Sequence, residues 1–178
     1  AIATELVETM CGRMQAPVLE RILAESGLDP AHAQDILNRY KSSYVEWQES
    51  TFPGLLPNCI AGRIANRFDL GGTNCVLDAA CASSLAALSM AVNELYLDQA
   101  DLVITGGVDA FNHILMYMCF SRTGAMSFSG DCRPFSEQAD GTMLGEGIGI
   151  LGLRRLKDAQ RDGNTIYAVI KGVGSSSD

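Results

Sequence analysis

The first part of the chain carries apolar side chains at the spacing of a helix. Leu6, Met10 and Met14 recur every four residues and predict an amphipathic helix. Pro17 is expected to end that helix and begin a second apolar-periodic stretch, because proline removes a helical hydrogen bond. Gly27 should end this second stretch. The start of the chain is therefore predicted to be helical, interrupted at the proline.

A further helix is predicted from residue 29 onward. Asp29 followed by Pro30 is typical of a helix start, with the aspartate as N-cap and the proline as the first helical residue. An apolar and aromatic stripe then follows, and stripes of this kind usually belong to the core, so no chemistry is assigned to it. The stripe consists of Ile36, Tyr40 and Tyr44, with Trp47 packed in the same cluster.

Beyond residue 54 the pattern changes to short apolar runs that alternate with helical segments. Such an alternation is typical of an α/β layered fold. We expect residues 1–54 to form a helical insert and residues 55–178 to form the core that carries the chemistry. The predicted strands are 73–77, 102–105, 148–153 and 166–173, and the predicted helices are 57–68, 85–95 and 154–161.

Composition and charge narrow the class of protein. The chain has 178 residues, 47% of them hydrophobic and 19% charged, which predicts one domain with a packed core. The net charge of −8 argues against binding to nucleic acid and against docking on an anionic membrane. The apolar runs are too short to span a bilayer, and the start of the chain does not resemble a signal peptide. We therefore expect a cytoplasmic protein.

The cysteines and histidines give little support for a metal site or a disulfide framework. No two cysteines have Cys-x-x-Cys spacing, and the histidines are His32 and His113. A chain this apolar can build its own core without disulfides. Most of the six cysteines are therefore expected to be buried, reduced thiols. The six are Cys11, Cys59, Cys75, Cys81, Cys119 and Cys132.

Cys81 differs from the other cysteines in its position. The predicted strand 73–77 runs into a turn of small residues, and Cys81 follows at the first turn of a helix. The positive end of a helix favours an ionised sulfur, and the backbone N–H of Cys81 could stabilise an oxyanion. A soft, nucleophilic sulfur is suited to exchanging one thioester for another. Position alone would also fit a small residue packing a strand–helix junction.

The segment Asp78–Leu85 (DAACASSL) resembles the nucleophile motif of β-ketoacyl synthases, which is usually DTACSSSL in modular polyketide synthases. Other landmarks of that family follow in the same order, and the resemblance covers about residues 55 to 178. They are Asn58–Asp69 (NCIAGRIANRFD), Asp101–Val108 (DLVITGGV), Cys132–Phe135 (CRPF), Ala139–Gly141 (ADG), Gly145–Gly147 (GEG), Asp162–Gly163 and Ile166–Lys171 (IYAVIK).

The resemblance implies a thiolase-like layered fold (αβαβα), of which this chain carries roughly the first half. It implies that Cys81 takes an acyl group from the phosphopantetheine arm of an acyl carrier protein and that decarboxylated malonyl then attacks the thioester. No cofactor is expected to bind directly. The family also implies a homodimer through the strand Thr73–Leu77. Two later histidines of the family have no counterpart here, so we predict that these 178 residues alone are inactive.

The subtype resembles the first ketosynthase of polyunsaturated fatty acid synthases. Ala79 and Ala82 depart from the modular polyketide pattern, as does the ending GVGSSSD. The segments APVLERILAESG and YVEWQESTFPG are similar to the polyunsaturated fatty acid type. Enediyne-type iterative polyketide synthases are close relatives of it.

Phe120 occupies the place where related enzymes put a phenylalanine beside the acyl pocket, although ordinary core packing explains it equally well. Two other function classes remain open. One is another thiolase-fold acyltransferase, such as a degradative thiolase, and the other is a non-catalytic partner that sets chain length or contributes only a dimer interface. The presence of Cys81 weighs against the second class, and a papain-like hydrolase is remote because no partner-histidine motif is visible.

Overall fold

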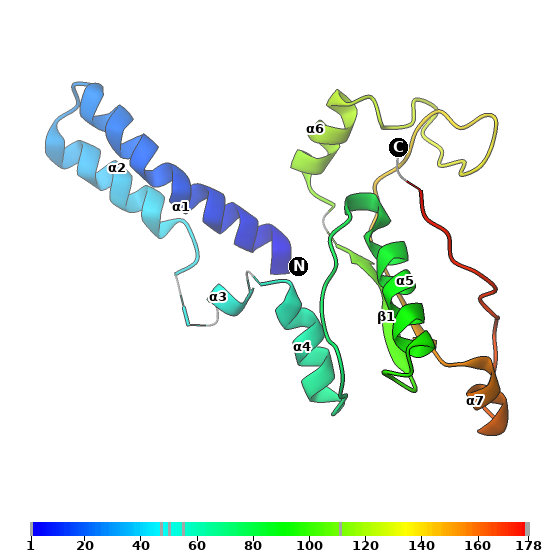
Figure 1. The fold of residues 1–178 in the computed structure, drawn as a ribbon. Coiled ribbons are helices and arrows are strands. Elements are labelled where there is room, and N and C mark those ends of the chain that lie inside the picture. Colours follow the sequence, from blue (N-terminus) through cyan, green and yellow to red (C-terminus); the bar gives the residue numbers. More distant parts are fainter. Residues whose placement is uncertain (1, 47, 50, 55, 111, 177–178) are drawn as a thin grey trace. The chain divides into compact units, whose positions relative to one another are not determined.

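The computed structural model describes residues 2–46, 48–49, 51–54, 56–110 and 112–176 (Figure 1), and the chain divides into two compact units. One unit contains Ala1–Cys59 and Ala110–Gly145, and the other contains Ile60–Asp109 and Glu146–Asp178. The prediction for Trp47 falls outside the described residues.

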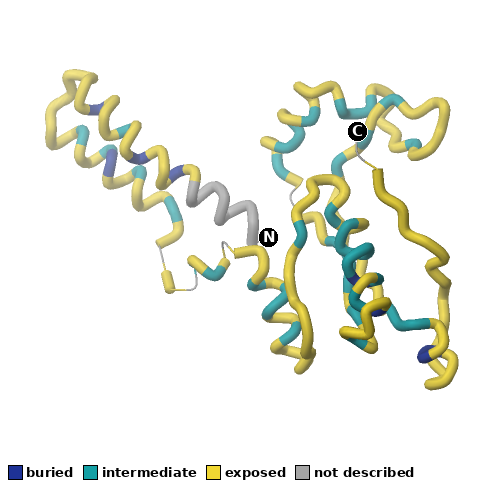
Figure 2. Tube along the Cα trace, viewed as in Figure 1, coloured by how far each residue is buried: buried dark blue, intermediate teal, exposed yellow. Residues whose placement is uncertain are grey.

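A helical hairpin dominates the first unit. Helix α1 spans Ile2–Glu25 and helix α2 spans Pro30–Ser42, and the two lie side by side (Figure 1). Their contact buries Ala16 and Leu23 of α1 and Leu37 of α2, which appear as dark segments of the hairpin in Figure 2. Burial of an amphipathic face is the main source of stability for such helices.

The start of α2 agrees with its sequence prediction. The carboxylate of Asp29 accepts hydrogen bonds from the backbone N–H groups of Ala31, at 3.1 Å, and His32, at 3.2 Å. Pro30 is the first helical residue. These bonds satisfy N–H groups that would otherwise have no partner at the helix start.

The predicted interruption at Pro17 is wrong, because α1 continues through it. Proline cannot donate to the carbonyl of Arg13, and it normally kinks or ends a helix. Here the residues on both sides of Pro17 are held by tertiary contact, since Ala16 and Leu23 are both buried. Packing in the hairpin outweighs the local preference of the proline.

The aromatic stripe of α2 has a structural role, as the sequence predicted. The Tyr40 hydroxyl donates to the Gly12 carbonyl of α1 at 2.9 Å, and the rings of Tyr40 and Tyr44 meet edge to face with centroids 5.3 Å apart. The Arg13 guanidinium donates to the Val45 carbonyl at 2.7 Å. These contacts fasten the end of α2 to α1.

The remainder of the first unit contains helix α3 (Thr51–Gly54), helix α6 (Ile114–Arg122) and a loop over residues 125–142. Asp140 holds this loop together. Its carboxylate accepts from the Ser127 hydroxyl at 2.7 Å and from the Ser129 N–H at 2.8 Å, and these two bonds lower the pKa of Asp140 below its usual value. Asp140 therefore has an internal role in the loop.

The second unit is built on a small sheet. Strands β1 (Val103–Asp109) and β2 (Gly147–Leu153) pair antiparallel, with Val103 opposite Leu153. Helix α5 (Ser83–Tyr96) packs on β1 and buries Ala91 and Leu95. The unit also contains most of helix α4 (Asn58–Arg67), the short 3₁₀ turn η1 (Ala80–Ala82) and helix α7 (Leu156–Arg161).

Of the four predicted strands, two are confirmed and two are wrong. Strand 148–153 is confirmed, and strand 102–105 is confirmed but continues through its glycines to Asp109. The predicted strands 73–77 and 166–173 are wrong, because neither segment joins a β-ladder within the described residues. A strand needs a neighbour for its N–H and C=O groups, and β1 and β2 pair with each other.

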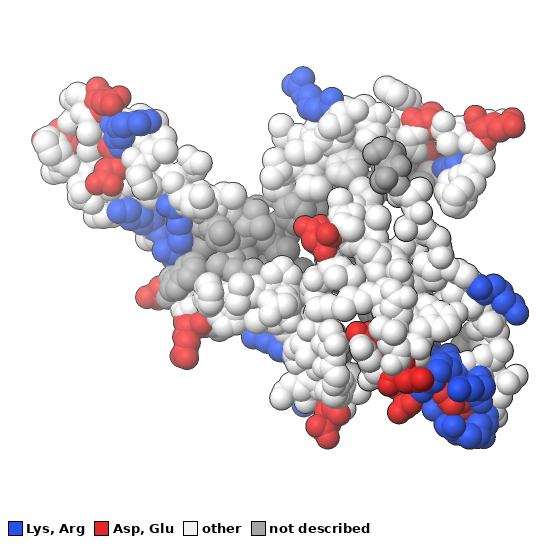
Figure 3. Space-filling view, in the orientation of Figure 1, with Lys and Arg blue, Asp and Glu red and all other residues white. Residues whose placement is uncertain are grey.

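Arg155 fastens the C-terminal end of α5 to the start of α7. Its guanidinium donates to the carbonyls of Leu95, at 3.1 Å, and Ala100, at 2.9 Å, and to the carboxylate of Asp158, at 2.6 Å. Asp98 and Asp101 also form ion pairs with it. Basic and acidic side chains mingle at this end of the unit (Figure 3). Since the Arg155 side chain is only 19% exposed, this network is structural.

We predict that Arg155→Lys weakens this connection although it keeps the charge. An ammonium group cannot reproduce the fork that serves two carbonyls and several carboxylates at once. The midpoint of thermal unfolding should fall, and hydrogen exchange at residues 95–101 should accelerate. Arg39→Lys is the matched control, since Arg39 forms only an exposed ion pair with Asp35 at 3.9 Å, and it should leave both measurements unchanged.

The order of α7 should depend on pH. Hydrogen bonds from Arg161 and then from Arg154 lower the pKa of Asp162 from 3.8 to about 2. A carboxylate whose pKa is lowered by folding stabilises the fold above its unfolded pKa and loses that contribution as the pH falls. Hydrogen exchange of α7, corrected for intrinsic rates, should therefore accelerate between about pH 4 and pH 2. Protection that stays constant over this range would contradict the prediction.

Candidate active site

Cys81 lies at the start of α5, in a tight turn. The residues before it, 73–79, form no regular secondary structure, and the chain then makes the single 3₁₀ turn Ala80–Ala82 before α5 begins at Ser83. Cys81 is therefore two residues before the first residue of the α-helix, slightly earlier than the sequence predicted. Its side chain is exposed, so the sulfur is open to a partner molecule. The cysteine is not sealed among packed aliphatic side chains.

The turn before Cys81 has strained backbone. Ala80 has a φ of 48°, which falls in the left-handed region that residues with a Cβ seldom adopt. A conformation of this kind costs on the order of 1–3 kcal/mol and persists only where its surroundings enforce it. Strain of this kind is often found beside reactive groups, because it turns a side chain outward from the fold.

Two side chains enforce the turn. The Asp78 carboxylate accepts from the backbone N–H of Ala80 at 3.0 Å. The Ser83 hydroxyl accepts from the N–H of Ala79 at 2.9 Å and donates to the carbonyl of Ala80 at 2.7 Å. The Ala82 N–H bonds to the Ala79 carbonyl at 3.0 Å. The N–H groups on both sides of Cys81 therefore have partners inside the turn.

The N–H of Cys81 itself makes no hydrogen bond to any part of the chain that the structure describes. The N-cap position of α5, Ala82, provides no side-chain bond, and the first turn of α5 contains no acidic residue. Both features leave the positive end of this helix without a neutralising group from its own first turn. The start of α5 can therefore stabilise negative charge that develops on an oxygen beside it.

Two glycines of β1 allow close approaches, one of α5 to the sheet and one between the two strands. A Cβ at Gly107 would lie 2.9 Å from the Cβ of Ser84 in the first turn of α5. A Cβ at Gly106 would lie 2.0 Å from the backbone oxygen of Gly149 in β2. Glycine is required where backbone and a neighbouring element meet this closely. Gly107 thus lets the first turn of α5 pack closely on β1, and Gly106 lets β1 and β2 approach each other.

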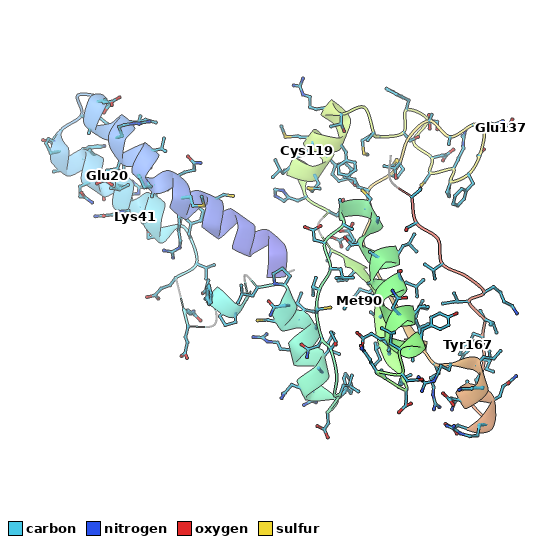
Figure 4. The ribbon with its side chains drawn as sticks, in the orientation of Figure 1. Glu20, Lys41, Met90, Cys119, Glu137 and Tyr167 are labelled. Carbon is cyan, nitrogen blue, oxygen red and sulfur yellow. The ribbon has the colours of Figure 1, made fainter. Side chains whose placement is uncertain are left out.

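The segment ahead of the turn runs beside α5. The thiol of Cys75 contacts the sulfur of Met90 at 3.9 Å, and Met90 lies on α5 (Figure 4). Cys75 is exposed, and the prediction that most of the six cysteines are buried is wrong, because five are exposed and Cys59 is half-buried. The exposure of Cys75 follows from the absence of a ladder at residues 73–77, since no second layer packs on the outer side of this segment within the described chain.

Phe120 lies in α6 and is half-buried there. Its carbonyl accepts from the Ala125 N–H and from the Thr123 hydroxyl, each at 3.0 Å, which closes the C-terminal end of that helix. Phe120 and Cys81 belong to different units. The role of Phe120 beside an acyl pocket stays a prediction.

Cys81 could be singled out from the sequence, but the residues that hold it in place were missed. Asp78 could have been found, since an aspartate that accepts the N–H two residues ahead is a common turn signal. The glycine pair also carried a signal, because glycine within a strand often marks a close approach of another element. Nothing in the sequence distinguishes the hydroxyl of Ser83 from that of Ser84.

Within the described residues, no group of three or more His, Cys, Asp and Glu side chains is placed to hold a metal ion. None of the helices there is long and apolar enough to cross a bilayer.

Comparison with known proteins places this chain in a family. Residues 21–159 match the model of the β-ketoacyl synthase N-terminal domain. The chain is 42% identical over 166 residues to one of the polyunsaturated fatty acid synthase subunits of Thraustochytrium, a match that covers 93% of this chain and 6% of that protein. It therefore spans only a small part of that relative.

Solved structures give the fold. A ketosynthase from module 6 of the bacillaene synthase of Bacillus subtilis matches with a TM-score of 0.58 at 36% identity, over 62% of this chain and 20% of that one. A type II polyketide synthase ketosynthase, solved in complex with its acyl carrier protein, matches with a TM-score of 0.59 at 25% identity, over 67% of this chain and 31% of that one.

The chain belongs to the β-ketoacyl synthase family. It has part of the thiolase-like layered α/β fold of the polyketide ketosynthases, which confirms the predicted fold class. Its relatives include ketosynthases of both polyunsaturated fatty acid and polyketide synthases, and the family is one of acyl-transferring condensing enzymes.

Proposed function

We propose that Cys81 is the nucleophile that accepts an acyl chain as a thioester. One observation carries the proposal: Cys81 is exposed on a strained turn at the uncapped start of α5. Family membership supports it, since the surrounding motif Asp78–Leu85 resembles the nucleophile motif of ketosynthases. None of the five other cysteines lies in that motif.

The first half-reaction is a thioester exchange. The Cys81 thiolate attacks the carbonyl carbon of an acyl thioester, a C–S bond to Cys81 forms, and the thiolate of the donor leaves. The carbonyl oxygen carries negative charge in the tetrahedral intermediate. The N–H of Cys81 and the start of α5 stabilise that charge. Cys81 itself supplies the nucleophile for this step.

The second half-reaction is a decarboxylative condensation. Malonyl on a carrier loses CO₂, and the resulting enolate carbon attacks the Cys81 thioester, so that a C–C bond forms and the Cys81 C–S bond breaks. The product is a 3-ketoacyl thioester that is two carbons longer. Neither His32 nor His113 lies in a motif of the family's enolate-stabilising histidines, so we assign this step to no residue of the present chain and expect the 178 residues alone to be inactive.

The acyl donor and the malonyl donor are proposed to be thioesters on the phosphopantetheine arm of an acyl carrier protein. A structural relative of this chain was solved with an acyl carrier protein bound, which supports a carrier as partner. Within the two related pathways we favour polyunsaturated fatty acid synthesis in the cytoplasm. That preference is supported by the 42% identity to a protein of a polyunsaturated fatty acid synthase, which extends over 93% of the chain.

We further propose that the enzyme is a homodimer in which segment Thr73–Leu77 pairs with its copy. Residues 73–76 are exposed and the segment joins no β-ladder within the described residues, and Val76 remains 47% accessible although it is apolar. Exposed, unpaired extended backbone is a template for pairing with a second strand. Phe120 is proposed to contact the acyl chain. The competing class is a thiolase-type acyltransferase, which shares the nucleophile but uses an acyl-CoA as its second substrate.

The proposal is tested on the complete enzyme that contains this chain, here called the intact protein, by mass spectrometry after incubation with an acyl thioester of a carrier protein. An acyl adduct is expected on the peptide that contains Cys81. Subsequent addition of malonyl carrier should discharge the adduct with release of CO₂, whereas acetyl-CoA should not. Discharge by acetyl-CoA alone would favour a thiolase, and the absence of any adduct on Cys81 would overturn the assignment.

A further inference from the structure

We infer that Ser83 is a positioning residue for the nucleophile: its hydroxyl fastens the strained turn that presents Cys81 and leaves the Cys81 N–H available for the oxyanion. The inference rests on the proposed role of Cys81 as the nucleophile. It starts from the geometry of the Ser83 hydroxyl, which bridges the two residues before Cys81 from the first position of α5.

The hydroxyl makes two bonds with opposite polarity. It accepts from the Ala79 N–H at 2.9 Å, and it donates to the Ala80 carbonyl at 2.7 Å. A hydroxyl can do both at once, whereas a side chain with only donors or only acceptors cannot. The two bonds hold the backbone from the Ala79 N–H to the Ala80 carbonyl, a stretch that includes the Ala80 α-carbon. They thereby maintain the left-handed conformation of Ala80, with its φ of 48°.

The Ser83 bonds are needed because the backbone of Ala80 is strained. Ala80 has a Cβ and therefore favours negative φ angles. Without bonds that hold the turn, its backbone would leave the left-handed region. The Asp78 carboxylate holds only the N–H of Ala80, at 3.0 Å. Relaxation of Ala80 would rotate the peptide that joins it to Cys81, and that peptide contains the N–H proposed to bind the oxyanion. The Ser83 hydroxyl therefore acts on catalysis through the backbone and does not touch the substrate.

The neighbouring serine provides a matched comparison. Ser84 is exposed, and its hydroxyl has no hydrogen-bond partner in the part of the chain that the structure describes. Its Cβ packs near Gly107, and this contact survives substitution by alanine. Ser83 and Ser84 are thus chemically identical neighbours, of which only the first is joined to the turn.

The test compares Ser83→Thr with Ser83→Val in the intact protein. The two side chains have nearly the same shape, and only threonine keeps the hydroxyl. We expect Ser83→Thr to load an acyl group at close to the wild-type rate. Ser83→Val should load about tenfold to a hundredfold more slowly, since displacement of a reacting group by about 1 Å costs on the order of a hundredfold. Ser84→Ala should load like the wild type.

A second measurement separates positioning from general damage. Alkylation of Cys81 by iodoacetamide displaces iodide at carbon and forms no oxyanion, so it does not need the Cys81 N–H. In Ser83→Val the alkylation rate should remain within about twofold of the wild-type rate. The midpoint of thermal unfolding should remain within a few degrees of the wild-type value. A selective loss of thioester loading, with alkylation retained, is the signature of a positioning role.

Two results would overturn the inference. Equal loading rates for Ser83→Thr and Ser83→Val would mean that the hydroxyl is not the determinant. A parallel loss of loading and alkylation would mean that the substitution only damages the fold. Failure of the proposed function is distinguishable from both, because in that case the wild-type protein itself would form no acyl adduct on Cys81.

Discussion

Replacement of Cys81 by alanine should leave the intact protein unable to accept an acyl group. The substitution removes the only atom that forms the thioester and keeps the Cβ, so the small-residue turn and the start of α5 should be undisturbed. Acyl transfer from a carrier thioester, followed by mass spectrometry, should fall below detection, and condensation with malonyl carrier should cease. Removal of a nucleophile commonly costs a factor of about 10⁶ in the rate of covalent catalysis.

The matched control for this prediction is Cys11→Ala. Cys11 is also an exposed thiol, and it lies in helix α1, where alanine is well accommodated. This variant should load and condense at the wild-type rate. Normal acyl loading of Cys81→Ala would contradict the assignment of the nucleophile, and equal loss in Cys11→Ala would show that the assay reports on folding instead of chemistry.

The second large effect is expected for Gly106→Ala. The added Cβ would lie 2.0 Å from the Gly149 oxygen and 2.9 Å from the Ile150 α-carbon. Both are backbone atoms, so no side chain can rotate away, and the two strands must separate. Overpacking costs roughly 1–3 kcal/mol where side chains can adjust, and we expect about 3 kcal/mol or more here. Denaturant unfolding of the intact protein measures this loss.

Gly149→Ala is the control for the sheet. Gly149 lies on β2 opposite Gly107, next to Ile150, which is the residue opposite Gly106. A Cβ at Gly149 would meet nothing within 4 Å. The variant should unfold at the wild-type denaturant concentration or slightly above it, since alanine restricts the unfolded chain more than glycine does. If both alanine variants are equally stable, the close approach of β1 and β2 at Gly106 is wrong.

Local features of the structure could be predicted well from the sequence. The start of α2 follows from Asp29 and Pro30, because an N-cap needs only residues within one turn of each other. Helix α5 follows from the spacing of Leu85, Leu88, Val92 and Leu95 for the same reason. The position of Cys81 at a helix start is likewise a local property of the motif Asp78–Leu85.

Features that depend on a distant partner could not be predicted in this way. The apolar runs 73–77 and 166–173 have the composition of strands, but no described neighbour pairs with them. Pro17 is a helix breaker by itself, yet contact with α2 keeps α1 continuous through it. A charged side chain such as that of Arg155 is usually exposed to solvent, whereas here it binds the carbonyls of Leu95 and Ala100.

The sequence by itself determined the family, the candidate nucleophile and the elements that are stabilised within one or two turns. The tertiary structure decided how that cysteine is held: the left-handed Ala80, the Ser83 hydroxyl that bridges it, and Gly107, which lets the first turn of α5 approach β1. The physical reason is the range of the interactions. Caps and helical periodicity act between close neighbours in sequence, whereas strain and strand pairing exist only once separate segments are brought together.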